Sequence, residues 1–310
     1  MYTFIINPNA RSGLGLQIWK QLEQLLKQLN VEYEAFLTSH RKHAWLYTKQ
    51  LTEDNAEHTI IVLGGDGTVN EVLNGIHDFR LITFGYIPIG SSNDFARGLA
   101  LPKDPMETLK QILTRPSIEE IDIGVLRYPG HERRFAVSTG IGFDAAVCHE
   151  AMVSRIKVFL NRLGLGRLTY AGIALHRILF DSPLTITLHL DQKDTITFDR
   201  AYFAVAMNLP YEGGGFQFCP QANCQDTCLD ILVIANMSKL KILALLPTAF
   251  KGWHTRFKGV YTYRCHEAVI ETSRTLPVHT DGEPVFLQKQ MQASCSPTKL
   301  RMLLPHPLHS

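Results

Sequence analysis

The first 122 residues carry two hydrophobic periods that follow one another along the chain. Apolar or alternating runs predict strands at 2–7, 31–37, 60–63 and 81–87. Apolar residues at helical spacing predict helices at 16–29, 43–51, 69–76 and 104–113. Strands that alternate with helices of this length predict a doubly wound parallel sheet of the α/β class, with helices on both faces.

The periodicity changes at about residue 122. Seven short alternating strands with polar or glycine breaks follow, and they predict a mainly antiparallel β domain, interpreted as a sandwich. Two stretches interrupt it, 151–180 and the helix-like 239–253. The predicted class is therefore α/β + β. We expect a first domain at 1–122, a β-sandwich at 123–298, and a tail at about 299–310 that packs back on the first domain.

A glycine-rich turn joins the most apolar strand to the next helix. The turn is Gly64-Gly65-Asp66-Gly67-Thr68. Its glycines let the backbone approach a ligand, and the first helical amides point at an anion, as in a phosphate site. A carboxylate beside phosphates is repelled unless a divalent cation lies between them, so Asp66 indicates a magnesium nucleotide. The alternative is that Asp66 only caps the helix it precedes.

A second special turn, PIGSSND at 88–94, follows the strand at 81–87. Its glycine permits a tight turn, its serines offer hydroxyls and amides, and Asn93 or Asp94 can cap the next helix. Ligands of parallel sheets bind beyond the carboxyl ends of the strands. The two turns, with Asn7 and Thr38 at the ends of the first two strands, therefore indicate the walls of a nucleotide cleft.

Composition narrows the class of protein. The chain has 310 residues, of which 45% are hydrophobic and 19% charged, as in ordinary soluble globular proteins. A net charge of +2 gives no reason to expect nucleic acid as a partner. We expect neither a signal peptide nor a membrane span, since no apolar run approaches the roughly 20 residues that a span needs. Six scattered cysteines suit a reducing cytosol.

Three of the cysteines cluster, with a histidine further along the chain. Cys219, Cys224 and Cys228 precede His266, but their spacings do not match the close pairs of common zinc sites. We expect buried thiols, or thiols that share a loop, rather than a metal or redox centre.

Several stretches resemble a known family. GGDGTVNEV at 64–72, PIGSSNDFAR at 88–97 and TDGEP at 280–284 resemble the diacylglycerol kinase catalytic family, in particular its bacterial soluble lipid kinases. The resemblance runs almost end to end and takes in NPNARSG near the start and NLPYEGGGF at 208–216. NAD kinases and phosphofructokinases share the GGDG turn, so that motif alone is less specific than the other two.

The resemblance implies an ATP-dependent lipid kinase with its active site in the interdomain cleft. It implies that the ATP site is lined by Asn7, Thr38, Gly64, Gly65, Asp66, Gly67, Thr68 and Ser91, with support from Asn70 and Glu71. Asp94 would face Asp66 across the cleft, and both would hold Mg²⁺. Asp281 matches the general base, and Glu283 matches an acidic residue on the nucleotide side. Without the resemblance, Asp281-Gly282 is better interpreted as a hairpin turn.

One stretch departs from the family pattern. These kinases commonly carry P-x-A-x-x-x-D-G-x-L-D, whose aspartate binds a structural magnesium, whereas this chain has PQANCQDTCLD at 220–230. Asp226 is kept, but Thr227 replaces the glycine, and Gln225 stands where a second carboxylate is frequent. Fewer anionic oxygens and a stiffer backbone weaken a site for a hard cation. A structural metal at Asp226 is therefore left open.

Two stretches of the second domain combine basic with apolar residues. Neither 151–180 nor 231–266 contains an acidic residue, and the second carries Phe250, Trp253 and Phe257 beside its lysines and arginines. This combination suits an anionic bilayer surface, and the alternative is a pair of solvated basic helix faces. Because a membrane-dissolved substrate requires docking, we expect a cytoplasmic protein peripheral to the inner face of the membrane.

The function predicted from the sequence is transfer of the γ-phosphoryl group of Mg-ATP to a lipid hydroxyl, of diacylglycerol or a related lipid, with Asp281 as base. One alternative is an NAD kinase, which explains the GGDGT turn but gives PIGSSNDFAR and the late DGE no role. The other is a catalytically silent nucleotide-binding regulator of the same fold. Whether the protein forms a homodimer is left open.

Overall fold

The computed structural model describes the chain except residues 115, 143–144, 146–181, 286, 306–307 and 309–310. The chain divides into two units, each of which is described by itself. Unit 1 comprises Met1–Ile123 and Pro297–Ser310, and unit 2 comprises Gly124–Ser296. The basic stretch expected at 151–180 lies outside the described residues.

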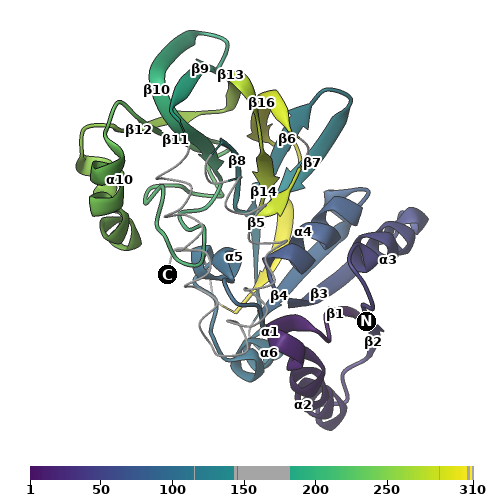
Figure 1. Cartoon of the computed structure of the whole chain (residues 1–310). Helices are drawn as coiled ribbons and strands as arrows, with labels where there is room; N and C mark the ends of the chain where they lie inside the picture. Colours follow the sequence, from purple (N-terminus) through teal and green to yellow (C-terminus); the bar gives the residue numbers. More distant parts are fainter. Residues whose placement is uncertain (115, 143–144, 146–181, 286, 306–307, 309–310) are drawn as a thin grey trace. The chain divides into compact units, whose positions relative to one another are not determined.

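Unit 1 is built on a six-stranded sheet with the strand order β2-β1-β3-β4-β17-β5. Its strands are β1 (Tyr2–Ile6), β2 (Tyr33–Leu37), β3 (His58–Gly64), β4 (Ile82–Pro88), β5 (Ser117–Ile121) and β17 (Leu300–Leu304). Every pairing is parallel except that of β17 with β5. β17 comes from the end of the chain and lies between β4 and β5, where Figure 1 shows it in yellow. The predicted α/β class is confirmed.

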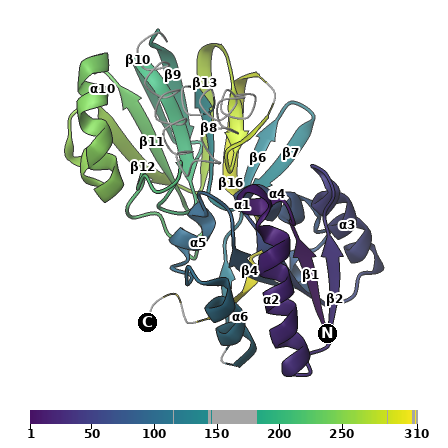
Figure 2. The same cartoon turned by 60° about the horizontal axis from the view of Figure 1, so that its bottom comes forward.

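Helices cover both faces of this sheet. They are α1 (Ala10–Gly13), α2 (Gly15–Gln28), α3 (His43–Leu51), α4 (Asp66–Gly75), α5 (Asp94–Gly98) and α6 (Pro105–Thr114), with the short 3₁₀ helices η1 (Thr52–Asp54) and η2 (Phe79–Leu81). The apolar stripe of α2 buries Trp19, Leu22 and Leu26 against Phe4 and Ile6 of β1. Figure 2 shows α6 beside α2 on this face. Alternate strand residues are buried on the other face, which α3 and α4 cover.

Unit 2 is an antiparallel β unit in which eleven strands form one continuous sheet. They are β6 (Gly124–Tyr128), β7 (His131–Phe135), β8 (Ser138–Gly142), β9 (Leu184–Leu190), β10 (Asp194–Met207), β11 (Leu229–Ala235), β12 (Val260–Cys265), β13 (Glu267–Leu276), β14 (Val278–Thr280), β15 (Glu283–Pro284) and β16 (Gln288–Cys295). The helical segments α10 (Lys239–Leu245), η3 (Leu246–Lys251) and η4 (Trp253–Arg256) join β11 to β12.

The long strand β10 lets this sheet fold around a core. Its register shifts between Phe198 and Ala201, so its first part pairs with β9 and its second part with β8 and β11. Inward residues of β9, β11 and β13, such as Leu188, Ile231 and Ile270, meet in one buried cluster. This arrangement confirms the predicted antiparallel β-sandwich-like domain.

Candidate active site

The parallel strands of unit 1 end at one edge of the sheet, and backbone hydrogen bonds tie their ends together. Asn7 N donates to Leu63 O at 2.9 Å, and Thr38 N donates to Ile6 O at 2.8 Å. The side chain of Asn7 donates from Nδ2 to Thr68 Oγ1 at 3.1 Å. The structure therefore brings together Asn7, Thr38 and the first glycine turn, as expected for one ligand-binding edge.

The two glycine turns contact each other through their backbones. A Cβ on Gly90 would lie 2.6 Å from the Cα of Gly65, closer than real Cβ atoms approach a neighbour. Ile89 N also donates to Gly64 O at 2.9 Å. Beside this contact Ser91 is exposed, and Asn93, at φ 52°, donates from Nδ2 to Gly90 O at 3.0 Å. Two turns separated along the chain thus form one surface of backbone groups.

Asp66 caps a helix, but a different helix from the one it begins. Its Oδ2 accepts a hydrogen bond from Asp94 N at 3.1 Å, and its Oδ1 accepts one from Phe95 N at 3.2 Å. These are the first amides of α5, whereas Asp66 itself is the first residue of α4. A carboxylate at a helix N-terminus is stabilised by the unsatisfied amides and the helix dipole.

This capping places two acidic residues side by side. Asp94 is buried, and its Oδ1 lies 3.7 Å from Arg97 Nε. Burial raises the pKa of Tyr86 well above its usual value, and the negative charges of Asp66 and Asp94 raise it further. Two neighbouring carboxylates favour a cation beside them, and Arg97 is one such cation.

The carboxylates of Asp66 and Asp94 match the number of protein ligands that Mg²⁺ usually has in nucleotide sites. Mg²⁺ usually keeps several waters and binds through one or two carboxylates plus substrate phosphates. Asp66 and Asp94 can supply that share. In the part of the chain that the structure describes, no three His, Cys, Asp or Glu side chains gather to hold a metal ion by themselves. Asp66 and Asp94 would need further oxygen ligands, such as waters and phosphates, to complete the coordination of Mg²⁺.

Glu71, expected to support the ATP site, contacts the start of α3. Its Oε1 accepts a hydrogen bond from Lys42 N at 2.7 Å, and Lys42 has a left-handed backbone with φ 68°. Glu71 therefore fixes the turn that follows Thr38 to helix α4. Asn70 is buried in α4, where its carbonyl accepts a hydrogen bond from Asn74 Nδ2 at 2.8 Å.

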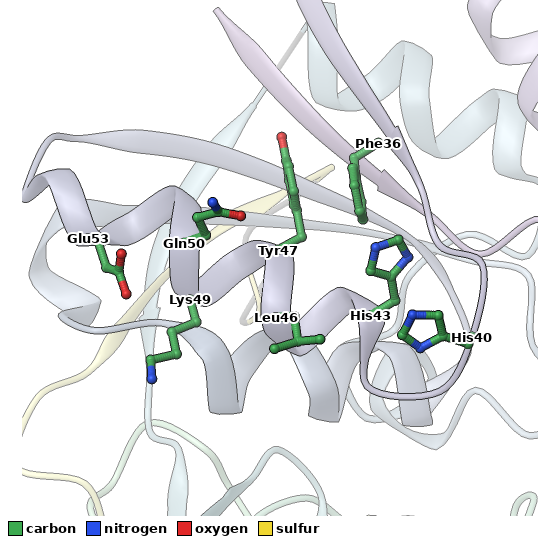
Figure 3. Close-up of a pocket in the computed structure, with 8 residues that line it drawn as sticks. All are labelled: Phe36, His40, His43, Leu46, Tyr47, Lys49, Gln50 and Glu53. Atoms are coloured by element: carbon green, nitrogen blue, oxygen red, sulfur yellow. The ribbon is translucent and has the colours of Figure 1, made fainter.

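A separate pocket of about 530 Å³ lies between the edge strand β2 and α3. Figure 3 shows the residues that line it, which are Phe36, His40, His43, Leu46, Tyr47, Lys49, Gln50 and Glu53. The rings of Phe36 and Tyr47 stack on each other at 3.7 Å, so they leave no slot between them for a flat ligand. None of the residues predicted for ATP lines this pocket.

In unit 2, Asp281 lies in the tight turn of the β14–β15 hairpin. Thr280 pairs with Glu283, and Asp281 and Gly282 have φ values of 50° and 76°. The Asp281 carboxylate also accepts three backbone hydrogen bonds, from Ala136 N at 2.9 Å, Val137 N at 2.8 Å and Ser138 N at 3.1 Å. The hairpin interpretation is confirmed, and the turn holds a half-buried carboxylate in a set orientation.

Sequence reasoning gave no role to three residues that surround this turn. Asn208 donates from Nδ2 to Ala136 O and from its backbone N to Val137 O, both at 2.8 Å. Glu212 and His279 pair with each other behind the hairpin. The only signal for Asn208 and Glu212 was their place in the NLPYEGGGF stretch, and His279 had none.

The loop at 220–230, where the sequence left a structural metal open, has another source of positive charge. The guanidinium group of Arg264 forms an ion pair with the Asp226 carboxylate, and Cys228 N donates to Asp226 Oδ1 at 3.0 Å. Thr227 has φ 62°, a conformation that the family's glycine adopts without strain. Arg264 therefore neutralises the Asp226 carboxylate, so this loop does not need a divalent cation to do so.

The clustered cysteines remain thiols in the described residues. Cys219 and Cys224 are buried. The Sγ atom of Cys228 lies 3.7 Å from His266 Nδ1. Burial, with the charges of Asp230 and Glu212, raises the pKa of Cys219 well above its usual value. A thiol in that environment is unreactive.

The chain combines a parallel α/β unit, with two glycine turns at its ligand edge, and an antiparallel β unit, with an Asp-Gly hairpin, which are the elements of a nucleotide-dependent kinase fold. Two family models match the chain. The diacylglycerol kinase catalytic domain matches residues 1–126, and the YegS C-terminal NAD kinase beta sandwich-like domain matches residues 137–304. YtlR of Bacillus subtilis, named as a lipid kinase, is 32% identical over 305 residues, which cover 96% of this chain and 98% of YtlR. The chain therefore belongs to the diacylglycerol kinase catalytic family.

Solved structures share the fold. A Bacillus anthracis structure titled as a diacylglycerol kinase has a TM-score of 0.77 at 23% identity and covers 98% of this chain and 97% of that chain. An NAD kinase from Archaeoglobus fulgidus in complex with ATP has a TM-score of 0.56 at 14% identity and covers 99% of this chain and 95% of that chain. Both likenesses show the fold alone.

Family membership sets the broad chemistry. The protein is a phosphotransferase with an alcohol acceptor, and a kinase of this family uses ATP as donor. Among the helices of the described ranges, none has the length and apolar character needed to cross a bilayer.

Proposed function

We propose that this protein transfers the γ-phosphoryl group of Mg-ATP to a hydroxyl of a membrane lipid, diacylglycerol or a close relative. The observation that carries the proposal is the environment of Asp281. An Asp-Gly hairpin needs only its backbone geometry. Here three consecutive amides also donate hydrogen bonds to the carboxylate and fix its orientation. A general base needs such a fixed orientation toward the hydroxyl whose proton it receives.

Unit 1 would hold the nucleotide. The glycine turns expose backbone amides at the start of α4, which are suited to phosphate oxygens, and Ser91 adds an exposed hydroxyl. Asp66 and Asp94 would hold Mg²⁺, which would neutralise the negative charge that develops on the phosphate oxygens during transfer. Glu283, next to the catalytic turn, would contact the nucleotide side.

Asp281 would act as the general base. Phosphoryl transfer passes through a loose transition state, so the base aligns the attacking hydroxyl more than it activates it. The Asp281 carboxylate accepts the hydroxyl proton as the oxygen attacks the γ-phosphorus and ADP leaves. A half-buried carboxylate with a fixed orientation suits this role better than a mobile one.

A transfer assay tests the proposed function and its rivals. The purified protein is incubated with γ-labelled ATP and Mg²⁺, either with a total lipid extract or with NAD, and the products are separated by chromatography. We expect label in a lipid that comigrates with a phosphorylated diacylglycerol or a related lipid. Labelled NADP, with no labelled lipid, would instead identify an NAD kinase. ATP binding without transfer to any acceptor would identify a silent regulator.

We also propose a membrane-docking surface, which is formed by α10, η3 and η4. Exposed apolar side chains gather there, namely Leu240, Phe250, Trp253 and Phe257, and α10 has no buried residue. Lysines and arginines of the same segment lie among them, including Lys251, whose Nζ lies 4.8 Å from the Trp253 ring centroid. The combination is complementary to an anionic bilayer and supports a cytoplasmic enzyme on the inner face of the membrane.

Vesicle sedimentation tests this docking surface. Trp253→Ala combined with Phe257→Ala should release the protein from vesicles that contain phosphatidylglycerol. Leu46→Ala, at an exposed leucine of α3 in unit 1, is the matched control and should bind as the wild type does. Equal binding of all variants, or equal binding to neutral vesicles, would count against the surface.

A further inference from the structure

A buried carboxylate–imidazole pair lies directly behind the Asp281 turn. His279 Nε2 is 3.2 Å from Glu212 Oε1, and the two side chains are 0% and 9% exposed. On its other side, His279 Nδ1 lies 3.1 Å from Gly282 N. A backbone N–H can only donate, so Nδ1 is the acceptor. The imidazole therefore carries its proton on Nε2 and donates it to the Glu212 carboxylate.

Glu212 is held by a loop that leaves it little freedom. Glu212 N donates to Phe216 O at 2.9 Å, and Phe216 N donates to Glu212 O at 3.0 Å. The three glycines between them all have positive φ, at 66°, 84° and 116°, which only glycine adopts readily. The GGG stretch thus closes a short loop and sets the position of the carboxylate.

The same stretch reaches the catalytic turn by a second route. Asn208 binds the carbonyls of Ala136 and Val137, and the amides of those two residues donate to the Asp281 carboxylate. The segment 208–216 therefore holds the residues whose amides donate to the Asp281 carboxylate. Through His279 it also holds the backbone amide of Gly282.

We propose that Glu212 and His279 are positioning residues for Asp281. The imidazole joins the Glu212 loop to Gly282 N and so holds the turn in the left-handed conformation that directs the Asp281 carboxylate at the acceptor hydroxyl. A hairpin does not need such a pair, and burying a carboxylate with an imidazole costs solvation. This inference rests on the proposed function, in which Asp281 receives the proton.

His279 is not itself the base. Its Nδ1 lone pair accepts from Gly282 N, and its Nε2 proton is directed at Glu212. Neither nitrogen is available to take a proton from a substrate hydroxyl, so the imidazole acts through the turn that it holds.

Two substitutions of His279 separate the two hydrogen bonds. In His279→Asn the amide oxygen takes the approximate place of Nδ1 and can accept from Gly282 N. In His279→Gln the amide nitrogen takes the approximate place of Nε2 and can donate to Glu212, but Gly282 N loses its acceptor. We expect kcat to fall about 10-fold in the first variant and about 100-fold in the second, with KM for ATP unchanged in both.

Controls keep the test independent of folding. His189→Asn alters a partly exposed histidine whose Nε2 lies 3.9 Å from Glu271 Oε2, and it should leave kcat unchanged. Glu212→Gln keeps an acceptor for Nε2 and should lower kcat by less than His279→Asn, which loses that hydrogen bond. Melting temperatures identify any variant that fails to fold. Equal losses in the two His279 variants, the reverse order, or a rise in KM for ATP would overturn the inference.

The Asp281→Asn variant, measured in the same assay, distinguishes failure of this inference from failure of the proposed function. Full activity of Asp281→Asn would remove Asp281 from the mechanism, and the proposed function would fail. An inactive Asp281→Asn together with a fully active His279→Gln would overturn only the positioning role.

Discussion

Gly65 and Gly90 approach each other so closely that a side chain on Gly90 would overlap the backbone of Gly65. A Cβ on Gly90 would lie 2.6 Å from the Gly65 Cα, and a Cβ on Gly65 would lie 3.1 Å from the Gly90 Cα. The two turns that carry the predicted ATP site therefore depend on each other for their shape. Bulk added to one must displace the other.

The first prediction concerns this contact. We expect Gly90→Ala to lower the free energy of unfolding by about 1–3 kcal/mol, the usual cost of overpacking, and to weaken ATP binding because the exposed amides move. Urea denaturation and calorimetric titration measure the two effects. Ser92→Ala, which adds no bulk in the same turn, should change neither. A Gly90→Ala protein with wild-type ATP affinity would contradict the prediction.

The second prediction separates the two roles of Asp66. Asp66→Asn keeps one oxygen that can cap α5, so its free energy of unfolding should fall by about 1 kcal/mol or less. Its lost charge removes a Mg²⁺ ligand, so phosphoryl transfer should fall about 100-fold or more. Chemical denaturation and the transfer assay are run on the same preparation. If Asp66 serves only as a cap, the variant will keep its activity.

The third prediction concerns Asp281. Asp281→Ala should abolish turnover and leave ATP binding largely intact, because the nucleotide is expected to bind to unit 1. Turnover is measured by lipid phosphorylation, and binding by titration with ATP. Glu283→Gln is the neighbouring comparison, and we expect it to raise KM for ATP rather than to abolish turnover. Wild-type-like activity of Asp281→Ala would remove the base from the mechanism.

The fourth prediction concerns the charge at Asp226. Because Arg264 already pairs with this carboxylate, chelation by EDTA should leave the melting temperature of the nucleotide-free protein unchanged. Arg264→Gln should lower the free energy of unfolding by up to about 1 kcal/mol, the range for a partly exposed pair. Arg256→Gln, at an exposed arginine, is the control. A large loss of stability on chelation would show a resident cation instead.

The fifth prediction concerns pH. Burial raises the pKa of Asp230 from 3.8 to about 6. The folded protein therefore binds this proton more tightly than the unfolded chain does, and the resulting stability is full below pH 3.8 and is lost as the pH rises through 6. Asp230→Asn should be more stable than the wild type above pH 7, by about 1–2 kcal/mol after solvent screening.

The difference between Asp230→Asn and the wild type should shrink as the pH falls toward 4. Thermal denaturation between pH 4 and 8 measures it. Asp199→Asn, at an exposed aspartate, should show no such dependence. A constant difference across this range would mean that Asp230 stays ionised throughout.

Much of the fold could be predicted because it follows from local periodicity. The strand expected at 60–63 lies within β3, and the helix expected at 43–51 is α3. Side chains in strands alternate and those in helices recur about every 3.6 residues, so the buried face is visible in the sequence itself. The tail was expected to return to the first domain, but nothing local indicated that β17 would lie between β4 and β5.

The sequence predicted the motifs of the candidate site, but it did not predict which side chains of the site contact each other. The turn at 64–68 correctly indicated a strand, a tight turn and a helix N-terminus. The capping role of Asp66, however, was considered only for its own helix, and it caps α5 instead. His279 and Arg264 carried no pattern that would have singled them out.

The sequence by itself determined the elements, the α/β + β class and the two glycine turns, because each is set by residues close to one another in the chain. Only the tertiary structure decided which groups meet. Asp66 reaches an amide 28 residues away, and Asp281 reaches one 145 residues away. Such contacts form because buried polar groups must find partners wherever folding brings them, and the partner's place along the chain leaves no local mark.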